Sequence, residues 1–132
     1  MKHTTMARLF EKTVNVSLVG AGGNGSQMLT GLCRLHIALK ELGHPGGLHV
    51  KVYDPDVVSE ANIGRQLFSS ADNGQYKSSV LVNRVNMFFG ISWTATHDKY
   101  NAHVQDDIII TCVDSAAARR ECVEDWDRYW TP

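Results

Sequence analysis

The chain has 132 residues and a mass of 14.7 kDa, which is the size of a single domain. With 43% apolar and 20% charged residues and a net charge of −1, it is not a disordered chain, and its charge gives no reason to expect nucleic acid or an anionic membrane as partner. It also lacks an apolar stretch near the roughly 20 residues that span a bilayer. Three widely spaced cysteines suit a reducing compartment, so we expect a cytoplasmic protein.

Strand and helix patterns alternate along the first half of the chain. The β-branched run Val14–Val19 predicts a buried strand, and a glycine-rich segment, Gly20–Ser26, follows it directly. Apolar residues spaced by four and three then predict a helix that ends at Gly43 and buries one face. That inward face is predicted to hold Met28, Leu32, Leu35, Leu39 and Leu42. A second strand is predicted over Leu48–Tyr53.

The second half continues the alternation. A helix is predicted over Tyr76–Phe89, with four apolar residues facing inward: Val80, Leu81, Val85 and Phe88. Ser92–Thr96 is a weak strand pattern and Asp107–Val113 a strong one. Ser115 can then cap a helix over Ala116–Glu121. Such alternation is typical of α/β domains with a mainly parallel sheet and flanking helices, so we predict a Rossmann-like fold.

The glycine-rich segment has the spacing of a nucleotide-binding turn. Gly20, Gly22 and Gly25 fit Gly-x-Gly-x-x-Gly between a strand and a helix. Gly20 permits a tight turn, Gly22 and Gly23 let backbone amides approach phosphates, and Gly25 lets the helix pack close to the sheet. The helix N-terminus would then face an anion. The turn alone does not distinguish ATP, NAD and FAD, and a glycine turn without a ligand is the alternative.

An acidic residue stands at the end of the second predicted strand. Asp54 is placed there to accept hydrogen bonds from ribose hydroxyls. The alternative is a solvated carboxylate in an Asp-Pro-Asp turn. Asp56 could assist Asp54, but we expect it to be a turn residue.

Charged and amide side chains after Asp54 suit a triphosphate better than a nicotinamide. Asn62, Arg65 and Gln66 lie in one short stretch, Lys77 opens the next helix, and Asp114 ends the last strand. Arginine offers a planar fork to phosphate oxygens and lysine a point charge. A carboxylate can hold Mg²⁺ whose other sites are filled by phosphate and water. The set therefore favours Mg·ATP over a dinucleotide.

These segments together resemble a known superfamily. Gly20-Ala-Gly-Gly-Asn-Gly-Ser26, Asp54-Pro-Asp, Asn62-x-x-Arg65-Gln66, Lys77 and Thr111-Cys-Val-Asp114-Ser115 resemble the ThiF/MoeB superfamily, the adenylating enzymes related to ubiquitin-activating enzymes. The sequence of these motifs is most similar to that of ThiF-like proteins of the plasmid-associated PRTRC gene system, and the resemblance covers residues 14–121. It implies a lead-in over residues 1–13 and an ATP-binding adenylation domain over residues 14–132.

The resemblance also implies an activity. Members bind Mg·ATP and adenylate the C-terminal carboxylate of a ubiquitin-like or sulfur-carrier protein, releasing pyrophosphate. The implied phosphate cradle consists of Gly20, Gly22, Gly23, Gly25 and Ser26. Asp54 would take the ribose, Asn62, Arg65 and Lys77 the phosphates, and Asp114 the Mg²⁺, with Arg65, Lys77 and Asp114 as the catalytic set. Where the family often has Asp-Cys-Thr-Asp-Asn, this chain keeps only the Cys and the metal-binding Asp of that motif, in Thr111-Cys-Val-Asp-Ser115.

The cysteines and the C-terminal aromatic residues add two expectations. Cys33 and Cys112 are expected to be packing residues, whereas Cys122, beside Arg119 and Arg120, is a candidate for a lowered thiol pKa. The aromatic residues Trp126, Tyr129 and Trp130 suggest a surface meant to be covered, so we expect a fragment that self-associates as a homodimer or needs a partner subunit.

Three functions remain open from the sequence. The first is an ATP-dependent adenylating enzyme, and the second is a nucleotide-binding subunit or scaffold without its own turnover. The third is an NAD(P)-dependent oxidoreductase, against which Arg65, Lys77 and Asp114 argue.

Overall fold

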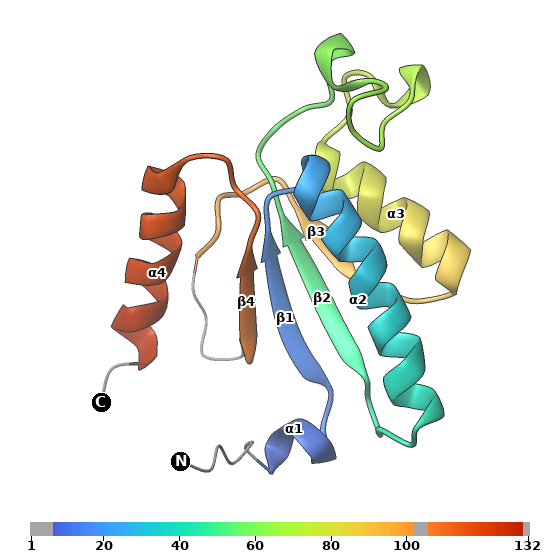
Figure 1. Ribbon diagram of the computed structural model, residues 1–132, viewed down its shortest axis with the longest axis vertical. Helices are drawn as coiled ribbons and strands as arrows, with labels where there is room; N and C mark the ends of the chain where they lie inside the picture. Colours follow the sequence, from blue (N-terminus) through green and yellow to red (C-terminus); the bar gives the residue numbers. More distant parts are fainter. Residues whose placement is uncertain (1–6, 102–105, 131–132) are drawn as a thin grey trace.

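The computed structural model describes residues 7–101 and 106–130, with the backbone alone for residues 128–130. Strands and helices alternate along these residues (Figure 1). The elements are α1 (Arg8–Glu11), β1 (Val14–Val19), α2 (Gly23–Glu41), β2 (Leu48–Tyr53), the short 3₁₀ turns η1 (Glu60–Asn62) and η2 (Ser70–Asp72), α3 (Lys77–Phe89), β3 (Thr94–Thr96), β4 (Ile108–Thr111) and α4 (Ala116–Trp130).

The four strands form one parallel sheet in the order β3-β2-β1-β4. Val19, the last residue of β1, pairs with Tyr53 of β2 and with Thr111 of β4, so the strands end at a common edge. This edge lies at the top of the sheet in Figure 1. The predicted Rossmann-like arrangement is therefore confirmed.

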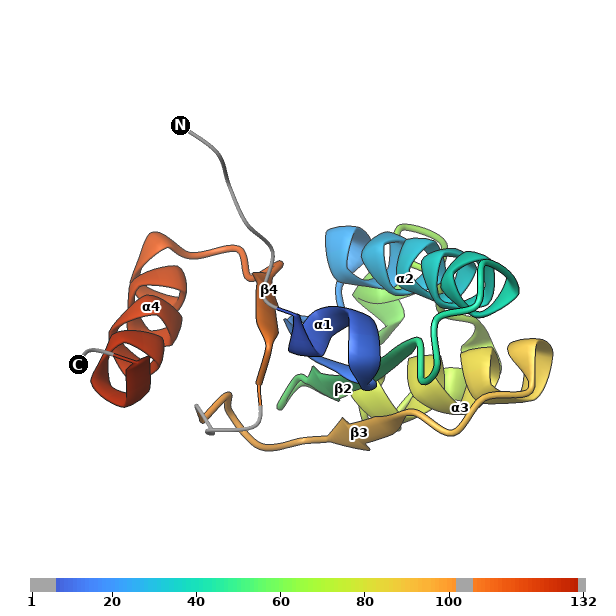
Figure 2. The same cartoon turned by 90° about the horizontal axis from the view of Figure 1, so that it is seen from below.

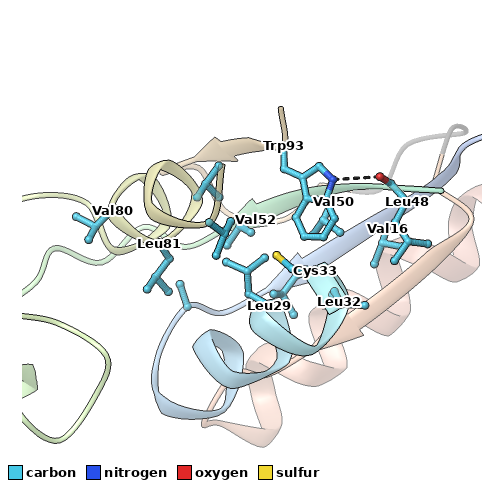
Figure 3. Close-up of a cluster of buried hydrophobic side chains, with 14 of the residues drawn as sticks. Val16, Leu29, Leu32, Cys33, Leu48, Val50, Val52, Val80, Leu81 and Trp93 are labelled. Carbon is cyan, nitrogen blue, oxygen red and sulfur yellow. Dashed lines mark hydrogen bonds between the residues drawn. The ribbon is translucent and has the colours of Figure 1, made fainter. Parts of the chain in front are cut away.

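The two faces of the sheet are covered differently. Figure 2 shows α2 and α3 on one side and α4 on the other. Side chains alternate along each strand, so Val16 and Val50 enter the buried core under α2 and α3, whereas Ser17 and Lys51 face the side of α4. Trp93 closes this core, and its indole Nε1 donates a 3.0 Å hydrogen bond to Leu48 O (Figure 3). No helix in the described part of the chain has the length and apolar character needed to cross a membrane.

The predicted inward face of the first long helix was wrong in part. The structure buries Leu32 and partly buries Leu39, but Met28, Leu35 and Leu42 are exposed by 39%, 48% and 86%. The buried arc is instead centred on Leu29, Leu32 and Cys33. Apolar residues cover more than half the circumference of α2, so their spacing permits several faces, and contact with the sheet selects one.

Most of the remaining boundaries differ from the predicted ones by one or two residues, but the last helix is nine residues longer than predicted. Helix α3 ends at Gly90, whose φ of +66° is left-handed. The helix buries Val80, Leu81 and Val85. The predicted inward position of Phe88 was wrong, since the side chain of Phe88 is 81% exposed. The Ser115 cap is confirmed, because Ala118 N donates to Ser115 Oγ at 3.1 Å. The helix that it caps continues to Trp130 rather than ending at Glu121.

Gly25 and Gly31 provide a matched test of the packing at the start of α2. A Cβ on Gly25 would overlap Gly20 O, whereas a Cβ on Gly31 would meet nothing within 4 Å. We expect Gly25→Ala to lower the free energy of unfolding by about 1–3 kcal/mol, because the helix must move away from the strand end. Gly31→Ala should instead raise it by roughly 0.5–1 kcal/mol. Urea denaturation of both variants measures the difference, and equal effects would contradict this packing.

Candidate functional site

A cavity of about 670 Å³ opens at the carboxyl edge of the sheet. It lies where the ends of β1, β2 and β4 meet the start of α2, and its far wall is formed by α4. Its lining includes most of the residues that the sequence singled out: Gly20, Gly22, Gly23, Asp54, Gln66, Lys77 and Asp114.

The glycine turn forms the part of the wall at the start of α2. Gly20 has a φ of +101°, and a Cβ there would lie 2.8 Å from Cys112 O, so only glycine fits. The first helical hydrogen bond is donated by Ser26 N to Gly22 O at 2.9 Å. The amides of Gly23, Asn24 and Gly25 precede it and have no acceptor within the helix. Together with the helix dipole, they make this end of the cavity favourable for an anion.

Asp54 is buried, with 6% of its surface exposed, and braces the glycine turn. Its Oδ2 accepts a hydrogen bond from Ala21 N at 2.6 Å, and its Oδ1 accepts one from Asp56 N at 2.8 Å. Burial raises the pKa of Asp54 above its ordinary value, and the two backbone hydrogen bonds oppose that shift. The carboxylate therefore has a structural role in the turn, and its contact with ribose stays a prediction.

Lys77 is a buried cation beside Asp54. Only 7% of its surface is exposed, although it lines the cavity, and its amide donates to Asp56 O at 3.0 Å. Among the described residues, no carboxylate lies within 4.0 Å of its ammonium group. A buried charge without an ion pair is costly, and an anion in the cavity would offset that cost.

Gln66 and Asp114 complete the predicted set that reaches the cavity. The amide nitrogen of Gln66 lies next to Gly22, at 3.5 Å from where a Cβ would stand. Its Oε1 is buried and has no hydrogen-bond partner among the described residues. Asp114 follows β4 and is exposed at the cavity wall, so its carboxylate is open to a ligand or a cation.

Four predicted site residues do not line the cavity. The side chain of Asn62 accepts hydrogen bonds from Ser59 N and Ser59 Oγ, both at 3.0 Å, and closes a capping box at η1. Arg65 is exposed on the loop that follows. Gly25 packs under the glycine turn, and Ser26 Oγ donates to Gly23 O at 3.0 Å. The predicted contacts of these four residues with a nucleotide stay predictions.

The wall on the side of α4 was not foreseen. Tyr53 and Tyr100 line it with rings in an edge-to-face contact, 5.3 Å between centroids. Tyr100 OH donates to Asp106 Oδ2 at 3.0 Å, and Ser17 Oγ donates to Asp106 Oδ1 at 2.8 Å. Burial raises the pKa of Tyr53 to about 12. Because Tyr53 directly precedes Asp54, its position at the cavity could have been predicted from the sequence, whereas Tyr100 belongs to no motif.

Carboxylates dominate the same wall. Helix α4 contributes three acidic residues to the cavity lining: Glu121, Glu124 and Asp125. They lie across the cavity from Lys77 and the start of α2, so one side of the cavity is favourable for anions and the other is not.

Cys122 lies among these acidic residues, and its surroundings argue against the lowered thiol pKa for which it was a candidate. Burial is the largest cause that raises the pKa of its thiol, and Asp125 and Glu121 raise it further. The guanidinium group of Arg119 is directed elsewhere, and its Nη1 donates to Val113 O at 3.1 Å. Burial also raises the pKa of Cys112, and that of Cys33 to about 11. The predicted packing role of Cys33 is confirmed by its complete burial, whereas Cys112 is half-buried at the cavity wall.

The thiols are expected to react slowly in the folded protein. In a Cys33→Ala/Cys112→Ala variant, the remaining Cys122 should react with a disulfide reagent more slowly at pH 8 than in urea, because burial and the carboxylates disfavour its thiolate. Lowering the pH to 7 should slow the reaction further. A rate in the folded protein equal to that in urea, or independent of pH over this range, would show a low thiol pKa.

Comparison with known proteins gives the family. The chain is 28% identical over 127 residues to the human ubiquitin-like modifier-activating enzyme 6, covering 83% of this chain and 11% of that enzyme. In fold it resembles E. coli tRNA N6-threonylcarbamoyladenosine dehydratase, TcdA, with a TM-score of 0.66 at 21% identity, over 90% of this chain and 49% of TcdA. It also resembles E. coli MccB in complex with AMPCPP and MccA, with a TM-score of 0.57 at 20% identity, over 86% of this chain and 33% of MccB.

The chain therefore spans half the length of these relatives or less. At these identities, the likeness to TcdA and MccB supports the fold alone. The sequence profile of the ThiF family matches residues 3–125, which include every strand of the sheet and the whole glycine turn. The chain belongs to the ThiF family.

Proposed function

We propose that this chain binds Mg·ATP at the carboxyl edge of its sheet and takes part in forming an acyl-adenylate on a carboxylate of a small protein or peptide. The observation that carries the proposal is Lys77, a buried cation without an ion pair among the described residues, next to the glycine turn. A phosphate chain is the ligand whose charge and hydrogen-bond acceptors fit both groups.

The residues present fit ATP. A Cβ on Gly23 would meet nothing within 4 Å, so the backbone there is open to a phosphate. The free amides at the start of α2 have no acceptor within the helix, and the Lys77 ammonium group has no carboxylate partner in the part of the chain that the structure describes; a triphosphate supplies acceptors for both. A cavity of about 670 Å³ is within the range of cofactor sites. TcdA has been solved in complex with AMP and with ATP, and those complexes share the fold described above.

Asp114 is the residue that would hold Mg²⁺. No cluster of three or more metal-type ligands occurs among the described residues, and Mg²⁺ bound to ATP needs only one or two protein carboxylates. When bound, Mg²⁺ supplies positive charge that neutralises phosphate oxygens. Asp56 lines the same cavity and supplies another carboxylate there. Its backbone amide is fixed by the hydrogen bond that it donates to Asp54 Oδ1.

The chain itself would contribute positioning and charge rather than proton transfer. An attacking carboxylate is ionised at neutral pH, so it needs no general base. Lys77 and the amides at the start of α2 would hold the phosphates and stabilise charge that builds up on them, which is typically worth several kcal/mol for a well-placed donor. Arg65 is exposed outside the cavity, and it would add a further cation if its loop moved toward the cavity.

The class of carboxylate rests on the relatives. One is named an activating enzyme for a ubiquitin-like modifier, and MccB was solved with MccA. TcdA is named a tRNA-modifying dehydratase, so relatives of one fold act on different substrates. We propose a peptide or protein C-terminus for this chain, because one relative is named for activating a ubiquitin-like modifier and another was solved with MccA. A nucleotide-binding subunit without turnover is the second candidate, because the cavity accounts for nucleotide binding and no described residue has been assigned to holding the carboxylate.

Substitution of Lys77 tests nucleotide binding. Lys77→Met keeps the length of the side chain and removes its charge, so we expect ATP affinity to fall by roughly 10- to 100-fold, the value of a charge-assisted hydrogen bond. Lys12→Met is the matched control, because Lys12 is exposed just before β1, at the amino end of the sheet. Calorimetric titration with Mg·ATP and with NAD measures both. Unchanged ATP affinity in Lys77→Met, or tighter binding of NAD than of Mg·ATP, would refute the proposed site.

Pyrophosphate exchange tests the reaction. With Mg·ATP and a peptide that ends in a free Gly-Gly carboxylate, we expect exchange of labelled pyrophosphate into ATP, whereas the same peptide as a C-terminal amide should give none. Asp114→Asn should abolish the exchange, because it weakens the Mg²⁺ ligand while keeping the side-chain shape. ATP binding without exchange for any such carboxylate would favour the nucleotide-binding subunit instead.

A further inference from the structure

The connection between β2 and α3 is a long loop with its own internal order. It runs over residues 57–76, and we call it the capped loop, because both of its 3₁₀ turns, η1 and η2, are closed by capping boxes. Figure 1 shows it at the carboxyl edge of the sheet, above the start of α3. Arg65 and Gln66 stand between the two turns, so their positions depend on what holds this loop.

The backbone of the capped loop is joined mainly to itself. Val58 N donates to Gln75 O at 2.8 Å, and Gly74 N donates to Val58 O at 2.9 Å, so the two ends of the loop are tied together. In the described part of the chain, one side chain from outside the loop forms hydrogen bonds to it, and this side chain is Arg84 of α3.

The guanidinium group of Arg84 joins two separate parts of the loop. Its Nη1 donates to Leu67 O at 2.6 Å, and its Nη2 donates to Asp72 Oδ2 at 2.8 Å in an ion pair. The same Asp72 oxygen accepts a hydrogen bond from Ser69 N at 2.8 Å and so closes η2. The bond from Ser69 N is the largest cause that lowers the pKa of Asp72, and the Arg84 guanidinium lowers it further. Asp72 is therefore ionised at neutral pH, and its bond to Arg84 is charge-assisted.

Leu67 is the point at which Arg84 acts on the cavity. It follows Gln66 directly, and its own side chain is 51% exposed, so burial does not fix it. Phe68 is buried in the core on one side, and on the other side Gln66 N donates to Asn62 O at 2.9 Å within the loop. Between these two points, the only described group that hydrogen-bonds to Leu67 O is Arg84.

Helix α3 thus contacts the site in two ways. Lys77 and Arg84 are seven residues apart, which is nearly two turns, so they lie on the same face of the helix. Lys77 lines the cavity itself. Arg84 does not line it, but the loop that it holds carries Gln66, whose carboxamide lies beside Gly22 at the cavity wall.

We propose that Arg84 is a positioning residue of the cavity, which holds the capped loop so that Gln66 stays against the glycine turn. Arg84 acts through the loop, because it is not itself part of the cavity lining. The consequence for nucleotide binding rests on the proposed function, whereas the holding of the loop does not.

Proteolysis measures the holding of the loop without a nucleotide. Arg65 in the loop and Arg34 on α2 are both exposed, and trypsin cleaves after either one where the backbone opens. In Arg84→Met, we expect cleavage after Arg65 to be about tenfold faster than in the unaltered chain, because a charge-assisted hydrogen bond is lost, and cleavage after Arg34 to be unchanged. Arg84→Lys keeps the charge without the planar fork and should give an intermediate rate. Equal acceleration at both sites, or none after Arg65, would overturn the proposal.

Coupling to Gln66 tests the consequence for the nucleotide. In calorimetric titration with Mg·ATP, Arg84→Met should weaken binding about five- to tenfold. Gln66→Leu should weaken it as well, and the double variant should bind no more weakly than Gln66→Leu alone, because Arg84 acts through Gln66. Arg34→Met is the matched control and should leave the affinity unchanged, since Arg34 lies outside the cavity.

Two outcomes of the titration would overturn the positioning role. One is an additive loss of affinity in the double variant, and the other is faster cleavage after Arg65 without any loss of ATP affinity. If the unaltered chain bound no Mg·ATP, the proposed function would be refuted instead, and the cleavage rates would still decide whether Arg84 holds the loop.

Discussion

The close contact between the end of β1 and the start of α2 is the constraint on which the site depends. Gly25 packs directly under Gly20 O, and the positive φ of Gly20 turns the chain into the helix. Asp54, at the end of the neighbouring strand, ties this turn to β2 through its hydrogen bond from Ala21 N. The free amides of α2 are therefore held at a fixed place relative to β2, and through the Asp56 turn relative to Lys77 at the start of α3.

The same contact sets the electrostatics of the cavity. The carboxylate of Asp54 is removed from water to brace the turn, which raises its pKa, and the nearby Lys77 ammonium group counteracts part of that shift. With Asp54 engaged by two backbone amides, Lys77 retains charge that no described carboxylate neutralises at short range. The cavity thus has a positive end at Lys77 and the start of α2, and a negative wall along α4.

The fold was largely predictable because local sequence patterns mark most of its strands and helices. β-branched runs mark β1, β2 and β4, and glycines or turns follow each of them, so strand order along the chain and the common edge followed from the parallel α/β rule. The inward face of α2 was not predictable, since apolar residues at 28, 29, 32, 33 and 35 allow several faces. The Ser17–Asp106–Tyr100 hydrogen bonds join residues 89 and 6 positions apart, and no local pattern signals such pairs.

Motif spacing predicted the positions of the site residues at the ends of strands and helices better than those of the site residues on the loop. Residues at strand ends and helix starts, such as Asp54, Lys77 and Asp114, lie where the sheet geometry requires, and all three reach the cavity. Asn62 and Arg65 stand on a long loop whose course is set by local capping boxes at Ser59 and Ser69 rather than by the sheet. The motif therefore predicted the positions of side chains next to strands and helices, but not those of side chains in the middle of a long loop.

The two walls of the cavity rest on unequal amounts of buried apolar surface. The wall formed by α2 and α3 stands on the main core, whose buried residues include Leu29, Val52 and Leu81. The wall formed by α4 stands on a smaller cluster of Val19, Tyr53, Tyr100 and Cys122, and the strand beside it leaves Ile108 41% exposed. Since local stability follows buried apolar contact, the groups proposed to hold phosphates belong to the more stable half of the domain. The acidic wall along α4 has less buried apolar contact beneath it, so it can change its conformation at a lower cost in free energy.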